Sequence, residues 1–331
     1  MRDVAIPGVA ARIPVIGFGC SALSNSGEKK ALELLETAFD TGVRHFDVAR
    51  YYGYGESEGI LGRFAKPRRM QITITTKFGI EPPQRTNALR VAMQAGRRFV
   101  KFVPAARGFL QRRTQGLVKS AAFSVSVAQA SLETSLRELG TDYIDFFLLH
   151  DYAVSDNSPD ELAAFMEEAV KSGKIRHFGL GTSIENILSA LDAQPELCNV
   201  LQFENSVLTR NLNRLPGGVA DRLTVTHGAL SASYNLVSTF LKANGQVVRD
   251  WSKILGVDCS RDEIISALML NYAVQANPNG LVLFSSRNAT RVRENICAVL
   301  EPEISSAQVE RFAQLVERDF MSIAGKDRRS V

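Results

Sequence analysis

The stretch "YIDFFLLH", Tyr143–His150, is apolar at nearly every position except Asp145 and its last residue. A strand with one face in water alternates apolar and polar residues, whereas here both faces are apolar. The same holds for "GLVLF", residues 280–284. Runs of this kind are typical of parallel strands that are covered on both faces.

Eight short runs of β-type residues recur along the chain, with helical patterns between them. The predicted strands are Val15–Cys20, His45–Arg50, Gln71–Lys77, Tyr143–His150, His177–Thr182, Asn199–Glu204, Leu223–His227 and Leu281–Ser285. The clearest helical patterns are Gly27–Asp40, Ser126–Leu139, Ser158–Val170, Arg261–Ala276, Asn288–Leu300 and a C-terminal helix, Ile304–Ala324. This alternation predicts an α/β fold, a (β/α)₈ TIM barrel, with an open doubly wound sheet as the alternative.

Residues 82–125 form a long basic insertion between the third predicted strand and the next helix. From Pro82 to Leu132 there is no acidic residue, and nine lysines and arginines more than account for the net charge of +4. A solvated loop with a basic amphipathic helix explains this better than a nucleic-acid surface, which is the alternative. Since such loops border the mouth of a barrel, we expect a mobile lid over the substrate or a flap that attracts anionic ligands. No linker divides residues 1–331, so we expect a single domain.

The composition is that of an ordinary soluble protein of 331 residues, 45% hydrophobic and 22% charged. No run approaches the ~18 consecutive apolar residues of a membrane span. The N-terminal "MRDVAIPGVAARIP" lacks the apolar segment of a signal peptide. The four cysteines have neither metal-type nor redox-type spacing. We therefore expect a cytoplasmic protein with reduced cysteines and no metal site.

A dinucleotide fingerprint, G-x-G-x-x-A, occurs in "VIGFGCSA", Val15–Ala22. Its function requires that a helix begin inside the motif, so that the helix N-terminus meets the pyrophosphate. Here residues 24–27 intervene before the helical pattern begins. We therefore interpret the motif as the exit of the first strand.

Four reactive side chains stand at or just after the ends of three predicted strands: Asp47, Tyr52, Lys77 and His150. Barrel enzymes carry their reactive groups at this edge, so the four are expected to converge. A phenol has a pKa near ~10, and a nearby ammonium is expected to lower it. This predicts Tyr52 and Lys77 as a general acid/base pair, with Asp47 holding the lysine charged and His150 orienting a substrate oxygen. Each residue alone could be structural.

The segments "GVRHFDVARYYGYGESEGILG" (42–62), "TITTKFG" (73–79) and "SLRELGTDYIDFFLLH" (135–150) resemble the signature segments of the aldo-keto reductase family. "KIRHFGLGTS" (174–183) and "RVRENI" (291–296) continue the match in order. The resemblance implies a (β/α)₈ barrel and an NAD(P)(H) cofactor bound without a Rossmann loop. It also implies that the tyrosine of the tetrad protonates a carbonyl as hydride arrives, or deprotonates an alcohol in reverse.

The resemblance extends to the cofactor site. Gln202 and Thr182 are expected at the nicotinamide, where Gly181 and Thr182 replace the family's Ser-Asn, and His227 takes the place of a stacking aromatic residue. Ser285 replaces a lysine that often contacts the 2′-phosphate. Two arginines remain for this phosphate, which favours NADP(H), with NAD(H) as the alternative. The residues expected at the adenosine end are Ser286, Arg287, Arg291, Glu294 and Asn295.

The substrate side carries "HDY", residues 150–152, where many family members have His-Trp-Pro. Asp151 suits a ligand rich in hydroxyl groups, and "LLHD" with "YYGYGESE" is most similar to the sugar dehydrogenase branch. We expect a small polar carbonyl or sugar substrate and a monomer or small homo-oligomer, with no nucleic-acid or membrane partner. The alternatives are a catalytically weak NADP-binding regulatory subunit, and a hydrolase or lyase in which Lys77 forms a Schiff base.

Overall fold

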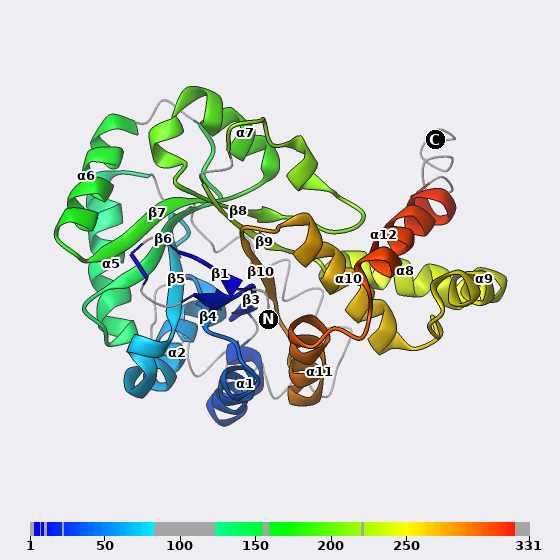
Figure 1. Cartoon of the computed structure of the whole chain (residues 1–331). Coiled ribbons are helices and arrows are strands. Elements are labelled where there is room, and N and C mark those ends of the chain that lie inside the picture. The colour runs from blue at the N-terminus through cyan, green and yellow to red at the C-terminus, as the bar shows by residue number, and fades with distance from the viewer. Residues whose placement is uncertain are drawn as a thin grey trace, which may run out of the picture.

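The computed structural model describes residues 3–6, 8–9, 12–21, 23–82, 123–154, 159–219 and 222–321. Eight parallel strands close into a barrel, each paired with its neighbours in the sequence and the last paired with the first (Figure 1). The predicted (β/α)₈ barrel is confirmed, and the open sheet is wrong. The strands are β3 (Ile16–Gly19), β4 (His45–Asp47), β5 (Thr73–Phe78), β6 (Ile144–His150), β7 (Ile175–Gly181), β8 (Val200–Glu204), β9 (Leu223–His227) and β10 (Leu281–Phe284).

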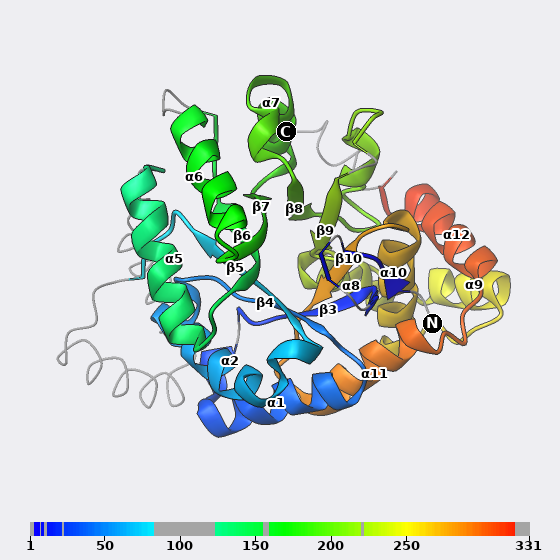
Figure 2. The ribbon, with the colours of Figure 1, turned by 60° about the vertical axis from the view of Figure 1, so that its left-hand side comes forward.

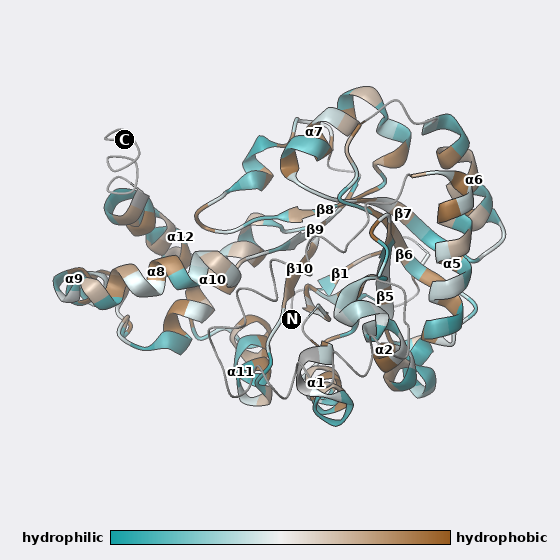
Figure 3. Cartoon of the chain, turned by 180° about the vertical axis from the view of Figure 1, so that it is seen from behind, coloured by the Kyte–Doolittle hydropathy of each residue, from teal (hydrophilic) through white to brown (hydrophobic). Residues whose placement is uncertain are grey.

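Helices surround the barrel and cover the outer faces of its strands (Figure 2). In Figure 3 these helices carry both apolar and hydrophilic residues, as expected for helices with one buried face. This cover explains why β6 is buried at all seven positions, as its apolar run predicts. The helices of the ring are α1 (Glu28–Asp40), α2 (Ser57–Ala65), α5 (Val125–Leu139), α6 (Pro159–Lys171), α7 (Ile184–Ala193) and α11 (Ala289–Leu300).

A short antiparallel hairpin precedes the barrel, formed by β1 (Asp3–Val4) and β2 (Ile13–Pro14). Val4 and Ile13 are buried and belong to the main apolar core. This hairpin could not be predicted from the sequence, because two-residue strands leave no alternating pattern to detect.

A second apolar core lies beside the barrel, at the right of Figure 1, and is centred on the fully buried Trp251. The indole Nε1 of Trp251 donates to Asp319 Oδ2 at 2.7 Å. Three helices contribute to this core between β9 and β10, where the sequence predicted only one: α8 (Ser231–Ala243), α9 (Gly245–Leu255) and α10 (Asp262–Ala276). The predicted C-terminal helix completes it as α12 (Ser306–Leu315) and a π-helix (Val316–Met321). We call α8, α9, α10 and α12 the helical lobe.

Helix α10 joins the two cores. Ile265 and Leu268 pack in the helical lobe, whereas Leu270 and Ala273 pack against the barrel. The expectation of a single domain over residues 1–331 stays a prediction. The proposed lid lies almost wholly outside the described residues, as does the end of the predicted C-terminal helix after residue 321. Within the described ranges, no helix combines the length and apolarity needed to cross a bilayer.

Candidate active site

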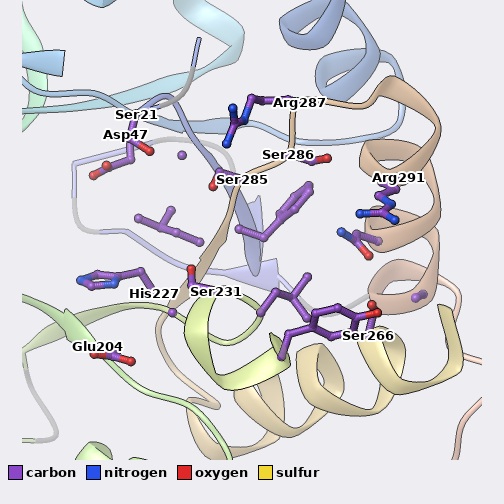
Figure 4. A pocket seen from close by; sticks show the side chains of 18 of the residues that line it. Ser21, Asp47, Glu204, His227, Ser231, Ser266, Ser285, Ser286, Arg287 and Arg291 are labelled. Atoms are coloured by element: carbon purple, nitrogen blue, oxygen red, sulfur yellow. The ribbon is translucent and has the colours of Figure 1, made fainter. Parts of the chain in front are cut away.

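A cavity of about 1380 Å³ opens at the carboxyl ends of the barrel strands. Figure 4 shows Asp47 and His227 on one side of it and Arg291 on the opposite side. The cavity therefore has two distinct ends. One lies at the ends of the strands and the other lies along α11. All thirteen residues that the sequence predicted for the site line it: Asp47, Tyr52, Lys77, His150, Asp151, Thr182, Gln202, His227, Ser286, Arg287, Arg291, Glu294 and Asn295.

Lys77 and Asp47 form a buried ion pair at one end of the cavity. Lys77 Nζ donates to both carboxylate oxygens of Asp47 at 2.7 Å and to the carbonyl oxygen of Val48 at 3.1 Å. Gln202 Nε2 donates to Asp47 Oδ2 at 2.9 Å. All three protons of the ammonium thus have acceptors, which is what a buried charge requires.

Tyr52 lies in a tight loop between β4 and α2. The backbone of this loop is left-handed at Gly53 (φ 60°) and at Tyr54 (φ 58°). A Cβ atom on Gly53 would lie 2.3 Å from Ser24 Oγ and 2.8 Å from Ser57 Oγ, so only glycine fits there. This packing brings the Tyr52 ring over the ion pair, with its centroid 5.2 Å from Lys77 Nζ.

The pKa of the Tyr52 phenol is raised well above its usual value of 10.0, chiefly by burial and then by the negative charge of Asp47. The expected net lowering of this pKa by the nearby ammonium is therefore wrong for the structure described. The physical reason is that Asp47 neutralises the ammonium while burial disfavours the phenolate. At neutral pH Tyr52 is a protonated phenol, which can donate a proton.

His150 lies edge-on to Tyr52, with ring centroids 6.0 Å apart. Burial, followed by the charge of Lys77, holds its pKa well below the usual 6.5, so the imidazole is neutral at pH 7. Its Nδ1 atom is buried and has no hydrogen-bond partner among the described residues. Tyr51, which the sequence analysis did not single out, packs on the same imidazole at 5.2 Å between centroids and lines the cavity.

Asp151 follows His150 and has a left-handed backbone, with φ 54°. Its amide donates to the carbonyl oxygen of Gly181 at 2.9 Å, which fixes this conformation. Partial burial raises the pKa of the carboxyl group, although Lys77 acts in the opposite direction. Tyr152, by contrast, is buried and donates to Gln194 Oε1 at 2.6 Å. Of these two residues only Asp151 reaches the cavity.

Gln202 and Thr182 form the wall next to the ion pair. The amide of Thr182 donates to the carbonyl oxygen of Gln202 at 3.0 Å, and Asn186 Nδ2 donates to Thr182 Oγ1 at 2.9 Å. Gln202 Oε1 is buried and has no partner among the described residues. His227, at the end of β9, lines the cavity. Partial burial of its imidazole lowers the pKa of this group.

The opposite end of the cavity lies at the start of α11 and is lined by two arginines, Arg287 and Arg291. The Asn288 side chain caps this helix by accepting from the backbone amides of Thr290 and Arg291. Neither the Arg287 nor the Arg291 guanidinium has an ion-pair partner in the part of the chain described. Two free guanidinium groups beside a helix N-terminus suit an anion such as a phosphate.

The helical lobe supplies the far wall, which the sequence analysis missed. Tyr234 of α8 and the first turn of α10 (Asp262 and Glu263) line the cavity. Lys242 Nζ lies 3.3 Å from Asp262 Oδ1 and links α8 to α10 there. No sequence signal identified these residues, because their place depends on how the lobe packs against the barrel.

The rejected dinucleotide fingerprint has a structural explanation. Helix α1 begins only at Glu28, after a 3₁₀ turn (Leu23–Ser26), so no helix N-terminus lies within the motif. A Cβ atom on Gly17 would lie 2.8 Å from Leu283 Cδ2 and 2.9 Å from His45 Cδ2. This glycine therefore permits close packing inside the barrel. Ala22 lies outside the described residues.

Comparison with known proteins assigns the class. The model of the Aldo/keto reductase family matches residues 15–317. The chain therefore belongs to the aldo/keto reductase family, as its signature segments indicated, and is a nicotinamide-dependent oxidoreductase.

Three curated relatives illustrate the range of the family. "Uncharacterized oxidoreductase YqkF" of Bacillus subtilis is 23% identical over 93% of this chain and 94% of its own. "Aldo-keto reductase yakc [NADP(+)]" of Schizosaccharomyces pombe is 26% identical over 62% of this chain and 53% of its own. "D-threo-aldose 1-dehydrogenase" of Pseudomonas sp is 28% identical over 56% of this chain and 55% of its own. The last two matches thus span about half of each relative.

A solved structure, the glycerol dehydrogenase AKR11B4 from Gluconobacter oxydans, has the same fold. It superposes with a TM-score of 0.70 at 16% sequence identity, covering 96% of each chain.

The cavity fits the nicotinamide cofactor that the family implies. Gln202 Oε1 and His150 Nδ1 are buried polar atoms at one end, and neither has a hydrogen-bond partner within the described ranges. The guanidinium groups of Arg287 and Arg291 line the other end, and the described residues hold no ion-pair partner for them. A long polar ligand with an amide at one end and phosphates at the other would satisfy both sets.

Proposed function

We propose that the protein is an NADP(H)-dependent oxidoreductase that interconverts a carbonyl group and an alcohol on a small, hydroxyl-rich substrate such as an aldose. Tyr52 would exchange the proton. The observation that carries the proposal is the convergence of a protonated phenol, a buried Lys77–Asp47 pair and a neutral imidazole at one end of one cavity.

Proton exchange is assigned to Tyr52 because the four groups differ in protonation. The phenol holds its proton at neutral pH, and His150 is neutral and can hydrogen-bond a substrate oxygen. Lys77 stabilises a phenolate once the proton has left, since its charge is 5.2 Å from the ring centroid. The raised pKa keeps the phenol protonated at neutral pH, which is the form of Tyr52 that the reduction of a carbonyl requires.

The bound cofactor would supply or accept the hydride. Gln202 and Thr182 would hold its carboxamide, and Arg287 and Arg291 its adenosine phosphates. The free guanidinium groups support NADP(H), because the additional 2′-phosphate is a dianion that an arginine can bind through two hydrogen bonds. The yeast relative named for NADP(+) agrees with this choice.

A polar substrate is supported by Asp151 and Tyr51. A non-glycine residue with positive φ is strained, and such strain persists where the side chain has a task. Asp151 and Tyr51 flank His150 from two different strand ends and place a carboxylate and a phenol at the cavity. Hydroxyl groups of a sugar could donate to one and accept from the other, and the aldose dehydrogenase relative acts on substrates of this class by its name.

The alternatives are less well supported. A regulatory subunit that binds NADP would need no protonated phenol beside a buried ion pair. A Schiff-base mechanism needs a free amine, whereas the three protons of Lys77 Nζ are held by Asp47 and Val48.

A substrate panel tests the proposal. NADP(H)-linked turnover is measured by cofactor absorbance with aldoses, polyols, small hydroxyaldehydes and hydrophobic aromatic aldehydes. We expect turnover of polar substrates, with Asp151→Asn raising KM for them about tenfold, the cost of one charge-assisted hydrogen bond. Tyr152→Phe is the control, because the Tyr152 hydroxyl group donates to Gln194 and neither residue lines the cavity. Turnover of aromatic aldehydes alone would refute the polar substrate, and absence of all turnover would favour the regulatory subunit.

A further inference from the structure

We propose that Glu58 is a positioning residue for the proton transfer: its buried carboxylate fixes the loop that carries Tyr52 to the strand that carries Lys77. The inference rests on the proposed function of Tyr52 and Lys77. It concerns a residue outside the cavity lining, on the first turn of α2.

The carboxylate of Glu58 is fully buried and uses both of its oxygens. Oε2 accepts from Arg50 Nη1 at 3.0 Å, and Oε1 accepts from Thr76 Oγ1 at 2.7 Å. Arg50 is itself mostly buried, with 13% of its side chain exposed. A buried glutamate is uncommon unless it is paired, and here each partner belongs to a different element.

These contacts surround the two reacting groups. Arg50 precedes Tyr52 by two residues, and its amide donates to the carbonyl oxygen of Lys77 at 3.3 Å. Thr76 immediately precedes Lys77 on β5. Glu58 follows the loop at the start of α2, so its pairing with Arg50 closes the loop 51–56 at its base. One side chain thereby links both ends of the Tyr52 loop to the residue next to Lys77.

The loop needs such a link because its own conformation is strained. Tyr54 is a non-glycine residue at φ 58°, a strained backbone conformation, and it interrupts the 3₁₀ turn Tyr52–Gly55. The phenol contacts Lys77 through a ring-to-ammonium separation of 5.2 Å, and a shift of about 1 Å in such a contact can cost on the order of 10²-fold in rate.

The test compares Glu58→Gln with a matched control, Asp145→Asn. Asp145 is also a fully buried carboxylate, and it accepts from Arg69, Arg176 and the amide of Ile74. It lies near the amino end of β6, five residues before His150 and thus roughly 17 Å along the strand from it. Both substitutions remove a buried negative charge and keep the size of the side chain.

We expect Glu58→Gln to lower kcat about 10- to 100-fold with little change in KM or in the Kd of NADPH, because binding surfaces are untouched while the proton donor moves. Asp145→Asn should lower the Tm by a similar amount and leave kcat within about twofold, since no catalytic side chain moves. Equal kcat values for the two variants, measured well below both Tm values, would overturn the inference.

A milder pair covers the case in which Glu58→Gln does not fold. Thr76→Val removes only the donor to Oε1, and Thr73→Val removes a buried hydroxyl group at the other end of β5, where it bonds His45. A reduced kcat in Thr76→Val but not in Thr73→Val supports the inference, and equal effects refute it.

The two proposals fail in different ways. An inactive wild-type protein would refute the proposed function. A crystal structure of Glu58→Gln or Thr76→Val would then still test whether Tyr52 has moved relative to Lys77. An active wild-type protein whose Glu58→Gln variant keeps its kcat would refute the positioning role alone.

Discussion

Lys77 Nζ lies 2.7 Å from each carboxylate oxygen of Asp47, although these side chains are only 3% and 4% exposed. Desolvating two charges is costly, and a pair of this kind is weak evidence for stability. A catalytic role explains better why the pair lies at the carboxyl ends of β4 and β5, because the pair holds an ammonium group beneath the ring of Tyr52.

Breaking the pair should therefore separate stability from activity. Asp47→Asn leaves the ammonium buried without a counter-charge, and we expect a loss of about 3–5 kcal/mol in the free energy of unfolding. The double variant Asp47→Asn/Lys77→Met should regain much of this, because no unpaired charge remains, yet it should be inactive. Urea denaturation and turnover assays measure the two quantities. A double variant that is active, or no more stable than Asp47→Asn, would contradict this explanation.

His45 should make stability depend on pH. It is fully buried between Thr73 and Thr75, and burial lowers its pKa to about 4 from 6.5. Because the folded state binds this proton less tightly than the unfolded state, stability falls as the pH drops from about 6.5 toward 4, by roughly 3 kcal/mol in all. Urea denaturation between pH 7 and 4 should show a steeper loss for the wild type than for His45→Gln. If the free energy of unfolding fell equally with pH in the two proteins, His45 would not contribute to the pH dependence of stability.

Gly53 should tolerate no side chain. Gly53→Ala places a methyl group against Ser24 and Ser57 at a positive φ, and we expect a loss of at least about 1 kcal/mol in stability together with reduced kcat. Gly217→Ala is the control, because a Cβ atom there has no neighbour within 4 Å and φ is not positive. Urea denaturation and turnover assays of both variants measure these effects. Equal stability and equal kcat for Gly53→Ala and Gly217→Ala would refute the requirement for glycine at position 53.

Arg291 should discriminate between the two cofactors. Arg291→Gln removes one of the two free guanidinium groups at the start of α11, and we expect the Kd of NADPH to rise about tenfold while that of NADH changes little. Arg293→Gln, an exposed arginine two residues further along α11 and outside the cavity lining, is the control. A similar loss of affinity for both cofactors would place Arg291 elsewhere than at a 2′-phosphate.

The barrel and the four strand-end residues could be predicted from the sequence because both depend on short-range patterns, whereas the cofactor-site residues were expected from the family resemblance. Apolar runs mark buried parallel strands, and polar residues at their ends must meet at one rim. His150 at the end of β6 and Lys77 near the end of β5 illustrate this directly.

The parts of the fold and of the site that could not be predicted from the sequence depend on tertiary packing. Helix α8, "SASYNLVSTFLKA", is rich in serine and β-branched residues with modest helix propensity, and it is stabilised by the second core around Trp251. From the sequence Glu58 would be assigned to the surface, whereas in the structure its carboxylate accepts hydrogen bonds from Arg50 and Thr76. The direction of Tyr51 and the raised pKa of Tyr52 follow from backbone angles and burial that no local pattern encodes.

The most direct measurement of the central claim, that Tyr52 transfers the proton, is the single-turnover rate of carbonyl reduction by Tyr52→Phe. Binding of NADPH, followed by its fluorescence, serves as the internal control. We predict a rate about 10²- to 10⁴-fold below that of the wild type with an unchanged Kd for NADPH. A Tyr52→Phe variant that reduces the substrate within a few-fold of the wild-type rate would contradict the account.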